Sequence, residues 1–171
     1  KDIREALGSY IWGIDEDRPE EQLGRLLADS GYTLAVMESC TGGMIASAIT
    51  EVPGSSNYFL GGVVSYSNDA KAFTGVDPSI IKKHGAVSLE CAGAMAEAVR
   101  DTFGADCAIS TTGIAGPEEI DGNPGGTVFI GYAHPKGSGV IKHQFPPRRP
   151  LVRHRAVTQA LLELVQAIQR V

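Results

Sequence analysis

The sequence contains few of the residues that build disulfide frameworks or metal sites. Its three cysteines, Cys40, Cys91 and Cys107, are odd in number and form no C-x-x-C pair. We therefore expect no disulfide framework and a reducing compartment, the cytoplasm, as the location. The four histidines lack spacings such as H-x-x-x-H or H-E-x-x-H, so no metal site is expected.

Long apolar runs and an excess of positive charge are also missing. No stretch approaches the roughly 18 apolar residues of a membrane span, and no signal peptide is recognisable. The formal net charge of −5 argues against non-specific binding to nucleic acid, which needs a basic surface to displace counterions from phosphates. We expect no membrane partner and no nucleic-acid partner, and any bound phosphate must be held by local groups.

Apolar periodicity and turn residues alternate between helical and extended segments, which predicts an α/β fold. The expected architecture is a single three-layer α/β/α domain at 19–171, after a lead-in or linker at 1–18. Its sheet is expected to be mostly parallel or mixed and covered by helices on both faces, with the last two strands joined by a turn at 136–139. The predicted helices are 19–30, 42–50, 78–84, 89–103 and 150–168, and the predicted strands are 33–37, 61–66, 106–110, 127–133 and 140–145.

The most informative stretch is Glu38-Ser39-Cys40-Thr41-Gly42-Gly43, between an expected strand and an expected helix. A glycine-rich turn at a helix N-terminus leaves backbone N–H groups unpaired, and the hydroxyls of Ser39 and Thr41 lie beside them in the sequence. This pattern predicts a site for an anion or an oxyanion. The alternative is that Ser39 or Thr41 only caps the helix.

Three further segments, 63–71, 110–117 and 124–128, place polar residues and glycines where strands are expected to end. Together with the first stretch, in this order and spacing, they resemble the CinA C-terminal domain family, the nicotinamide-mononucleotide amidohydrolases. The resemblance runs from about Leu23 to about Val165. In two-domain members a stretch such as 1–18 follows an N-terminal domain, which would be missing here.

The resemblance implies hydrolysis of the carboxamide of nicotinamide mononucleotide to nicotinate mononucleotide and ammonia, through an acyl-enzyme and without a cofactor. It assigns the catalytic set to Ser39, Tyr66 and Lys71. Ser39 would be the nucleophile, and Lys71, screened from water, would accept its proton directly or through Tyr66. Cys40 is the competing nucleophile, with a packing role as its alternative. The structural alternatives are a solvated Lys71 and a packed Tyr66.

Residues expected around the substrate serve three purposes. Backbone N–H groups of the glycine turn would hold the oxyanion, threonine hydroxyls would face a ribose or phosphate, and Arg149 or Arg148 would pair with the phosphate. The alternatives are a strand-end charge for Glu38, a plain turn at 111–116 and solvated arginines. The expected substrate-binding residues are Glu38, Cys40, Thr41, Gly42, Gly43, Thr111, Thr112, Gly113, Ala115, Gly116 and Arg149.

One segment departs from the family pattern. Where many relatives carry glycines and a Lys-Pro-Val-Gly stretch, this chain has Glu118-Glu119-Ile120-Asp121-Gly122, and the added carboxylates oppose a phosphorylated substrate. Two other functions therefore stay open: a non-catalytic nucleotide-binding or regulatory module of a competence- or damage-inducible protein, and an amidohydrolase for another small amide. The resemblance also implies a homo-oligomer, with a dimer favoured.

Overall fold

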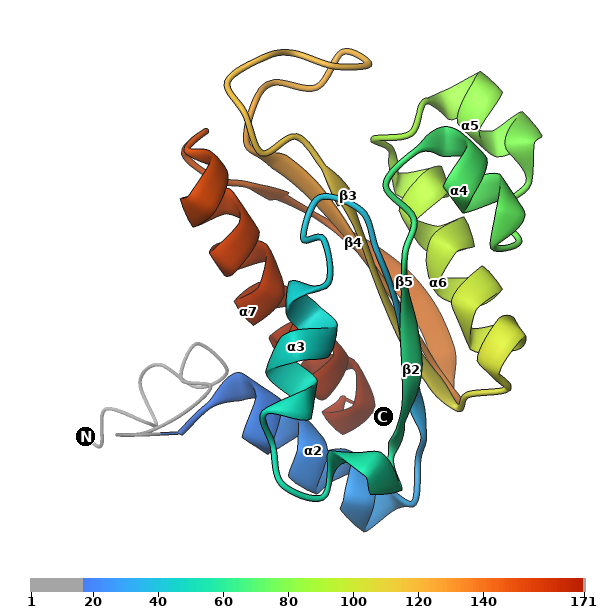
Figure 1. The fold of residues 1–171 in the computed structure, drawn as a ribbon, viewed down its shortest axis with the longest axis vertical. Helices are drawn as coiled ribbons and strands as arrows, with labels where there is room; N and C mark the ends of the chain where they lie inside the picture. Colours follow the sequence, from blue (N-terminus) through green and yellow to red (C-terminus); the bar gives the residue numbers. More distant parts are fainter. Residues whose placement is uncertain (1–16, 171) are drawn as a thin grey trace.

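The computed structural model describes residues 17–170 and shows a five-stranded sheet in the order β2-β1-β3-β4-β5 (Figure 1). Strand β1 runs parallel to both β2 and β3, whereas β3, β4 and β5 are successively antiparallel. The sheet is therefore mixed, which confirms the predicted α/β class. The strands are β1 (Leu34–Glu38), β2 (Phe59–Val64), β3 (Cys107–Gly113), β4 (Thr127–His134) and β5 (Gly137–Gln144).

Helices cover both faces of this sheet, as predicted. Helix α6 lies on one face with α4 and α5 beside it, and α2, α3 and α7 lie on the other (Figure 1). No helix among residues 17–170 is long and apolar enough to cross a membrane. The helices are α2 (Pro19–Ser30), α3 (Met44–Thr50), α4 (Asn68–Phe73), α5 (Pro78–His84), α6 (Leu89–Phe103) and α7 (Arg149–Gln169), with a 3-10 turn, η2 (Ser55–Asn57), before β2.

Strand β1 is buried along its whole length because helices lie on both sides of it. Its residues alternate between two hydrophobic clusters. Leu34 and Val36 belong to the cluster that contains α2 and α7 residues, and Ala35 and Met37 belong to the cluster that contains α6 residues. The continuous apolar run 34–37 is thus a central strand, and the polar residues that follow it lie at the edge of the sheet.

Two helices end where turn chemistry predicts. Helix α2 starts at Pro19 and stops at Gly31, which has a left-handed φ of 67°. The Ser88 hydroxyl caps α6 by accepting a hydrogen bond from the Cys91 N–H, and Gly104 closes the helix with a φ of 62°. These local signals are independent of the tertiary contacts.

Several local expectations differ from the structure. Strand β3 continues to Gly113, past its predicted end at 110, and β2 ends at Val64, before its predicted end at 66. Helix α4 was not predicted; the Ser67 hydroxyl caps it by accepting from the Ala70 N–H. The turn expected at 136–139 is a two-residue connection, because His134 pairs with Gly137 and the following residues belong to β5. Gly139 lies against a ring, since a Cβ there would come 2.7 Å from the Tyr132 Cζ, so this glycine serves close packing instead of a turn. The predicted lead-in lies outside the described residues up to residue 16.

Candidate functional site

A pocket of about 230 Å³ opens where β1, β2 and β3 end. Parallel strands end at the same edge of a sheet, which is where α/β proteins bind ligands. The segments at and after the ends of the three strands, including α4, supply most of its wall, and the loop between α5 and α6 and the start of α7 supply the rest. The lining residues are Ser39, Cys40, Tyr66, Asn68, Lys71, Ala86, Val87, Thr112, Gly113, Ala115, Ile120 and Arg149.

Lys71 is buried in this pocket, with 2% of its surface exposed. Its Nζ atom is 3.1 Å from the Ser39 Oγ and donates to the Ser65 carbonyl oxygen at 2.9 Å. No carboxylate forms an ion pair with Lys71 within residues 17–170. Burial lowers the pKa of Lys71 from its ordinary value of 10.5, because the charged ammonium loses its hydration. The amine is thus biased toward its neutral form, next to a serine hydroxyl.

Cys40 lines the same pocket but lacks the environment of a reactive thiol. Only 6% of its surface is exposed, and burial raises the pKa of Cys40 to about 12. Since the thiolate is the nucleophilic form, this cysteine stays protonated near neutral pH. The geometry favours Ser39 over Cys40 as the attacking group.

The N-terminus of α3 is occupied by a side chain of the protein itself. The Glu38 carboxylate accepts hydrogen bonds from the N–H groups of Gly43, Ile45 and Ala46 at 2.9 to 3.1 Å. The helix dipole and the unpaired N–H groups attract this buried carboxylate as they would attract a ligand anion. The expected anion site at this helix end is therefore filled. The alternative that Ser39 or Thr41 caps α3 is also wrong, because no side-chain hydroxyl bonds to the start of this helix, and Glu38 does not line the pocket.

Glu38→Ala is expected to destabilise the fold by about 1 to 3 kcal/mol, because it leaves buried N–H groups without an acceptor. Glu38→Gln keeps one acceptor oxygen and should cost less. The measurement is the free energy of unfolding from urea titration, with the exposed Glu119→Gln as the control. Equal free energies of unfolding for Glu38→Ala and wild type would show that the Glu38 cap does not stabilise the fold.

The glycine turn cannot supply the oxyanion donors that its sequence suggested. The Gly42 N–H donates to the Ser39 carbonyl oxygen at 3.2 Å, and the Gly43 N–H donates to Glu38. In the described part of the chain, the N–H groups of Cys40 and Thr41 have no backbone or side-chain acceptor other than the Cys40 sulfur itself. These two groups are the remaining donors of the turn, directly after Ser39.

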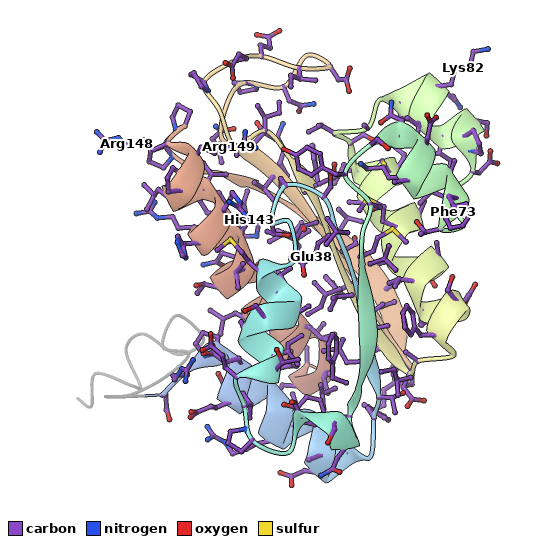
Figure 2. All side chains as sticks on the ribbon, in the orientation of Figure 1. Glu38, Phe73, Lys82, His143, Arg148 and Arg149 are labelled. Carbon is purple, nitrogen blue, oxygen red and sulfur yellow. The ribbon has the colours of Figure 1, made fainter. Side chains whose placement is uncertain are left out.

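Tyr66 lies at the mouth of the pocket, with 60% of its surface exposed. Its hydroxyl accepts a hydrogen bond from the Arg149 Nη2 at 2.8 Å, and no hydrogen bond joins it to Lys71 or Ser39 within residues 17–170. Of the two expected routes for the serine proton, the geometry matches the direct one, because the Lys71 Nζ lies 3.1 Å from the Ser39 Oγ. Arg148 and Arg149 are both exposed, and both are labelled in Figure 2. Arg149 lines the pocket, whereas Arg148 does not.

The threonines at the end of β3 divide between the core and the pocket. Thr111 is buried, and its Oγ1 is 2.7 Å from the Thr41 Oγ1; neither residue lines the pocket. Thr112 lines it and donates to the Ala86 carbonyl oxygen at 2.7 Å. Gly113 and Ala115 also line it, whereas Gly116 does not. The side chains of Thr41 and Thr111 thus bond to each other and stabilise the turn, and their contacts with substrate stay a prediction.

Five residues of the site were not assigned from sequence. Asn68, Ala86, Val87 and Ile120 line the pocket, and the Arg153 Nη2 donates to the Thr41 carbonyl oxygen at 2.9 Å. Asn68 carried a signal, since it follows Tyr66 in a polar segment after a strand. Ala86 and Val87 come from the loop before α6, Ile120 from a turn after β3, and Arg153 from α7. No local sequence pattern assigns these residues to the site.

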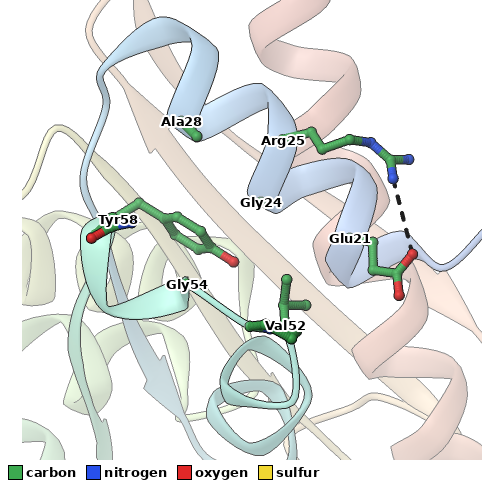
Figure 3. A pocket seen from close by; sticks show the side chains of 9 residues that line it. Glu21, Gly24, Arg25, Ala28, Val52, Gly54 and Tyr58 are labelled. Carbon is green, nitrogen blue, oxygen red and sulfur yellow. Dashed lines mark ion pairs between the residues drawn. The ribbon is translucent and has the colours of Figure 1, made fainter.

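A second pocket, of about 350 Å³, lies between α2 and the segment that leads to β2 (Figure 3). Glu21, Arg25 and Tyr58 line it, and Arg25 and Glu21 form an ion pair at 3.9 Å. Ser39, Tyr66 and Lys71 do not line this pocket. This pocket therefore lies apart from the buried lysine and serine, and the pocket of about 230 Å³ is the candidate active site.

Comparison with known proteins relates the chain to one family. A sequence model described as the CinA C-terminal domain matches residues 16–168. A CinA-like protein from Desulfotalea psychrophila is 47% identical over 162 residues, which cover 93% of this chain and 39% of the relative. A CinA-like protein from Thermotoga maritima is 43% identical over 167 residues, covering 96% and 40%. The chain thus spans about two-fifths of the length of these curated relatives.

Solved structures agree with this relation. The competence damage-inducible protein A (ComA) from Klebsiella pneumoniae superimposes with a TM-score of 0.84 at 31% identity, over 90% of this chain and 98% of that chain. The competence/damage inducible protein CihA from Agrobacterium tumefaciens gives a TM-score of 0.79 at 34% identity, with coverage of 90% and 98%. The fold, the family model and the sequence identity together show that this chain belongs to the CinA C-terminal domain family.

Proposed function

We propose that this chain is a serine amidohydrolase that converts nicotinamide mononucleotide and water to nicotinate mononucleotide and ammonia. The observation that carries the proposal is the buried Lys71, whose Nζ is 3.1 Å from the Ser39 Oγ. A buried lysine without a carboxylate partner is costly for the fold, and such groups concentrate at active sites. Family membership supports the site, and the sequence resemblance supplies the substrate.

The proposed first step is attack of the Ser39 Oγ on the carboxamide carbon. Lys71 in its neutral form takes the hydroxyl proton, so the serine becomes a competent nucleophile. The N–H groups of Cys40 and Thr41 donate to the oxyanion, which replaces the role expected for Gly42 and Gly43. In strand-turn-helix elbows the residue after the nucleophile commonly serves this purpose.

The second step breaks the C–N bond. The Lys71 ammonium returns its proton to the departing nitrogen, ammonia leaves and Ser39 carries the acyl group. Water then attacks the ester with Lys71 as the base, and the acid is released with Ser39 restored. The cycle consumes one water and produces one ammonia, and it uses no redox cofactor.

We place the substrate phosphate at Arg149. This arginine lines the pocket at the start of α7 and its guanidinium donates to Tyr66, so both side chains lie at the mouth, away from the Lys71 end of the pocket. A guanidinium matches two phosphate oxygens at once. We accordingly assign Tyr66 to contact with the substrate and not to proton transfer.

Arg149→Ala is expected to raise the KM for nicotinamide mononucleotide by about 10- to 100-fold, the effect of losing a charge-assisted contact, with little change in kcat. Nicotinamide riboside, which lacks the phosphate, should respond far less. Steady-state ammonia release with both substrates measures this difference, and the exposed neighbour Arg148→Ala is the control. An equal rise in KM for both substrates would show that Arg149 does not bind the phosphate.

The deciding experiment for the function is ammonia release from nicotinamide mononucleotide by the wild-type chain, with nicotinamide riboside and simple aliphatic amides as comparison substrates. Preference for the nucleotide supports the proposal. Turnover of a different amide alone would favour the broader amidohydrolase, and binding of the nucleotide without ammonia release would favour the regulatory module. The domain at 19–171, the cytoplasmic location and the homo-oligomer stay predictions.

A further inference from the structure

The turn Ile120–Asn123 has a defined backbone. Ile120 and Asn123 exchange two backbone hydrogen bonds, of 3.1 and 2.9 Å. Asp121 and Gly122 between them have φ values of 54° and 71°. Positive φ at both central residues is the pattern of a type I′ turn, for which Asp-Gly is a favoured pair. The acidic segment that departs from the family pattern therefore ends in a tight hairpin turn.

Side-chain hydrogen bonds fasten this turn to the pocket. The Asn123 Nδ2 donates to the Val87 carbonyl oxygen at 2.9 Å, and the Lys142 Nζ donates to the Asn123 Oδ1 at 3.2 Å. Val87 lines the pocket, and its neighbour Ala86 accepts from Thr112, another lining residue. The turn is thus hydrogen-bonded to the part of the pocket wall that the loop between α5 and α6 forms.

The pocket has groups of two chemical kinds. Ser39, Lys71 and Asn68 offer polar atoms, whereas Ala86, Val87 and Ile120 offer aliphatic surface. Ile120 is 47% exposed, so half of a large apolar side chain faces water when the pocket is empty. An apolar ligand surface that covers Ile120 gains the free energy of removing that area from water.

We propose that Ile120 packs against the ring that carries the scissile carboxamide, and that Asn123 is the positioning residue that holds Ile120 there. The inference rests on the proposed function for the identity of the ring. It makes the turn Ile120–Asn123 the element that selects a flat ring over an aliphatic amide, independently of the phosphate. Residues from the divergent segment would then set substrate choice in this chain.

Binding to the Ser39→Ala protein tests this without turnover, by calorimetry with nicotinamide mononucleotide and nicotinamide riboside. Adding Ile120→Ala should raise the Kd of both ligands by a similar factor, about 10-fold, the effect of truncating one wall of an apolar pocket. Leu89→Ala, equally exposed at 47% but outside the pocket, is the matched control and should leave both Kd values unchanged. A change below twofold, or one confined to the nucleotide, would overturn the inference.

Asn123→Ala should weaken both ligands in the same way as Ile120→Ala, and the double variant should be no weaker than the stronger single one, since both changes remove one contact. With Ser39 present, KM should rise while kcat stays within about twofold. A fall in kcat instead, or additive effects, would reject the positioning role.

The two proposals fail separately. If the wild type releases no ammonia but the ligands bind with the Ile120 dependence described, the reaction is rejected and the ring site stands. If ammonia is released and Ile120→Ala binds as tightly as its parent, the ring site is rejected and the reaction stands. Absence of binding to either ligand would overturn the ring site directly.

Discussion

Ser39→Ala is expected to reduce ammonia release from nicotinamide mononucleotide by a factor on the order of 10⁴ to 10⁶, because it removes the proposed nucleophile and the raised pKa of the neighbouring Cys40 keeps that thiol protonated. The fold should survive, since the change removes one hydroxyl and leaves the Lys71 Nζ bonded to the Ser65 carbonyl oxygen. The measurement is initial-rate ammonia release, together with the free energy of unfolding to verify that the protein is folded.

Two further variants sharpen this result. Ser47→Ala removes an exposed serine from α3 and should keep the wild-type rate. Cys40→Ala tests the competing nucleophile: the raised pKa of Cys40 predicts a loss far smaller than that of Ser39→Ala. Full activity of Ser39→Ala with loss of activity in Cys40→Ala would assign the chemistry to the thiol and reject the proposed mechanism.

Lys71→Met is expected to lower kcat by about 10²- to 10⁴-fold, the usual contribution of a positioned acid–base group. Methionine keeps the length and apolar stem of the side chain but cannot accept the serine proton. In the wild type, kcat/KM should rise with pH as Lys71 loses its proton, with a midpoint below 10.5 because burial lowers the pKa of Lys71. The Lys71→Met protein should lack this ionisation.

Lys71 should also make the free energy of unfolding depend on pH. The unfolded chain keeps the Lys71 proton up to the ordinary pKa of 10.5, whereas the folded chain releases it at lower pH. Between these two pH values the unfolded state binds more protons, so the free energy of unfolding rises with pH. Wild type should therefore gain stability relative to Lys71→Met as the pH approaches 10.5, and show a constant difference well below the folded-state pKa.

Urea titrations of both proteins across this pH range measure the effect. Lys82→Met, which removes an exposed lysine from α5, is the control and should show no such trend relative to wild type. A difference between wild type and Lys71→Met that does not change with pH would mean that Lys71 titrates normally in the folded protein. The proposed general base would then lack its physical basis.

Much of the fold was predictable from short-range chemistry. Pro19 and Gly31 bound α2, Ser88 and Gly104 bound α6, and the apolar run 34–37 forms the central strand. These signals act within a few residues, so a sequence contains them directly. Helix α4 was missed because it has only six residues and its one local signal is the hydroxyl cap at Ser67.

The candidate site divides in the same way. The family resemblance assigned Ser39 and Lys71, and Arg149 was expected beside Arg148 near the last helix; the structure brings Ser39, Lys71 and Arg149 to one pocket. The fate of the α3 N-terminus was not predictable, because Glu38 is five residues before Gly43 and only the folded turn returns its carboxylate to the helix. Similarly, the Tyr66 hydroxyl lies with Arg149, 83 residues away.

The amino-acid sequence alone determined the α/β class, the order of the main elements and the membership of a family, since these depend on periodicity, caps and motif spacing. Only the tertiary structure decided which polar groups are free to act. It buries Lys71 beside Ser39 and withdraws Glu38, Thr41 and Thr111 from the pocket. It also adds Ile120 from a distant turn. The reason is physical: burial and hydrogen-bond partners arise from contacts between segments far apart in the chain, and these set the charge and the reactivity of each group.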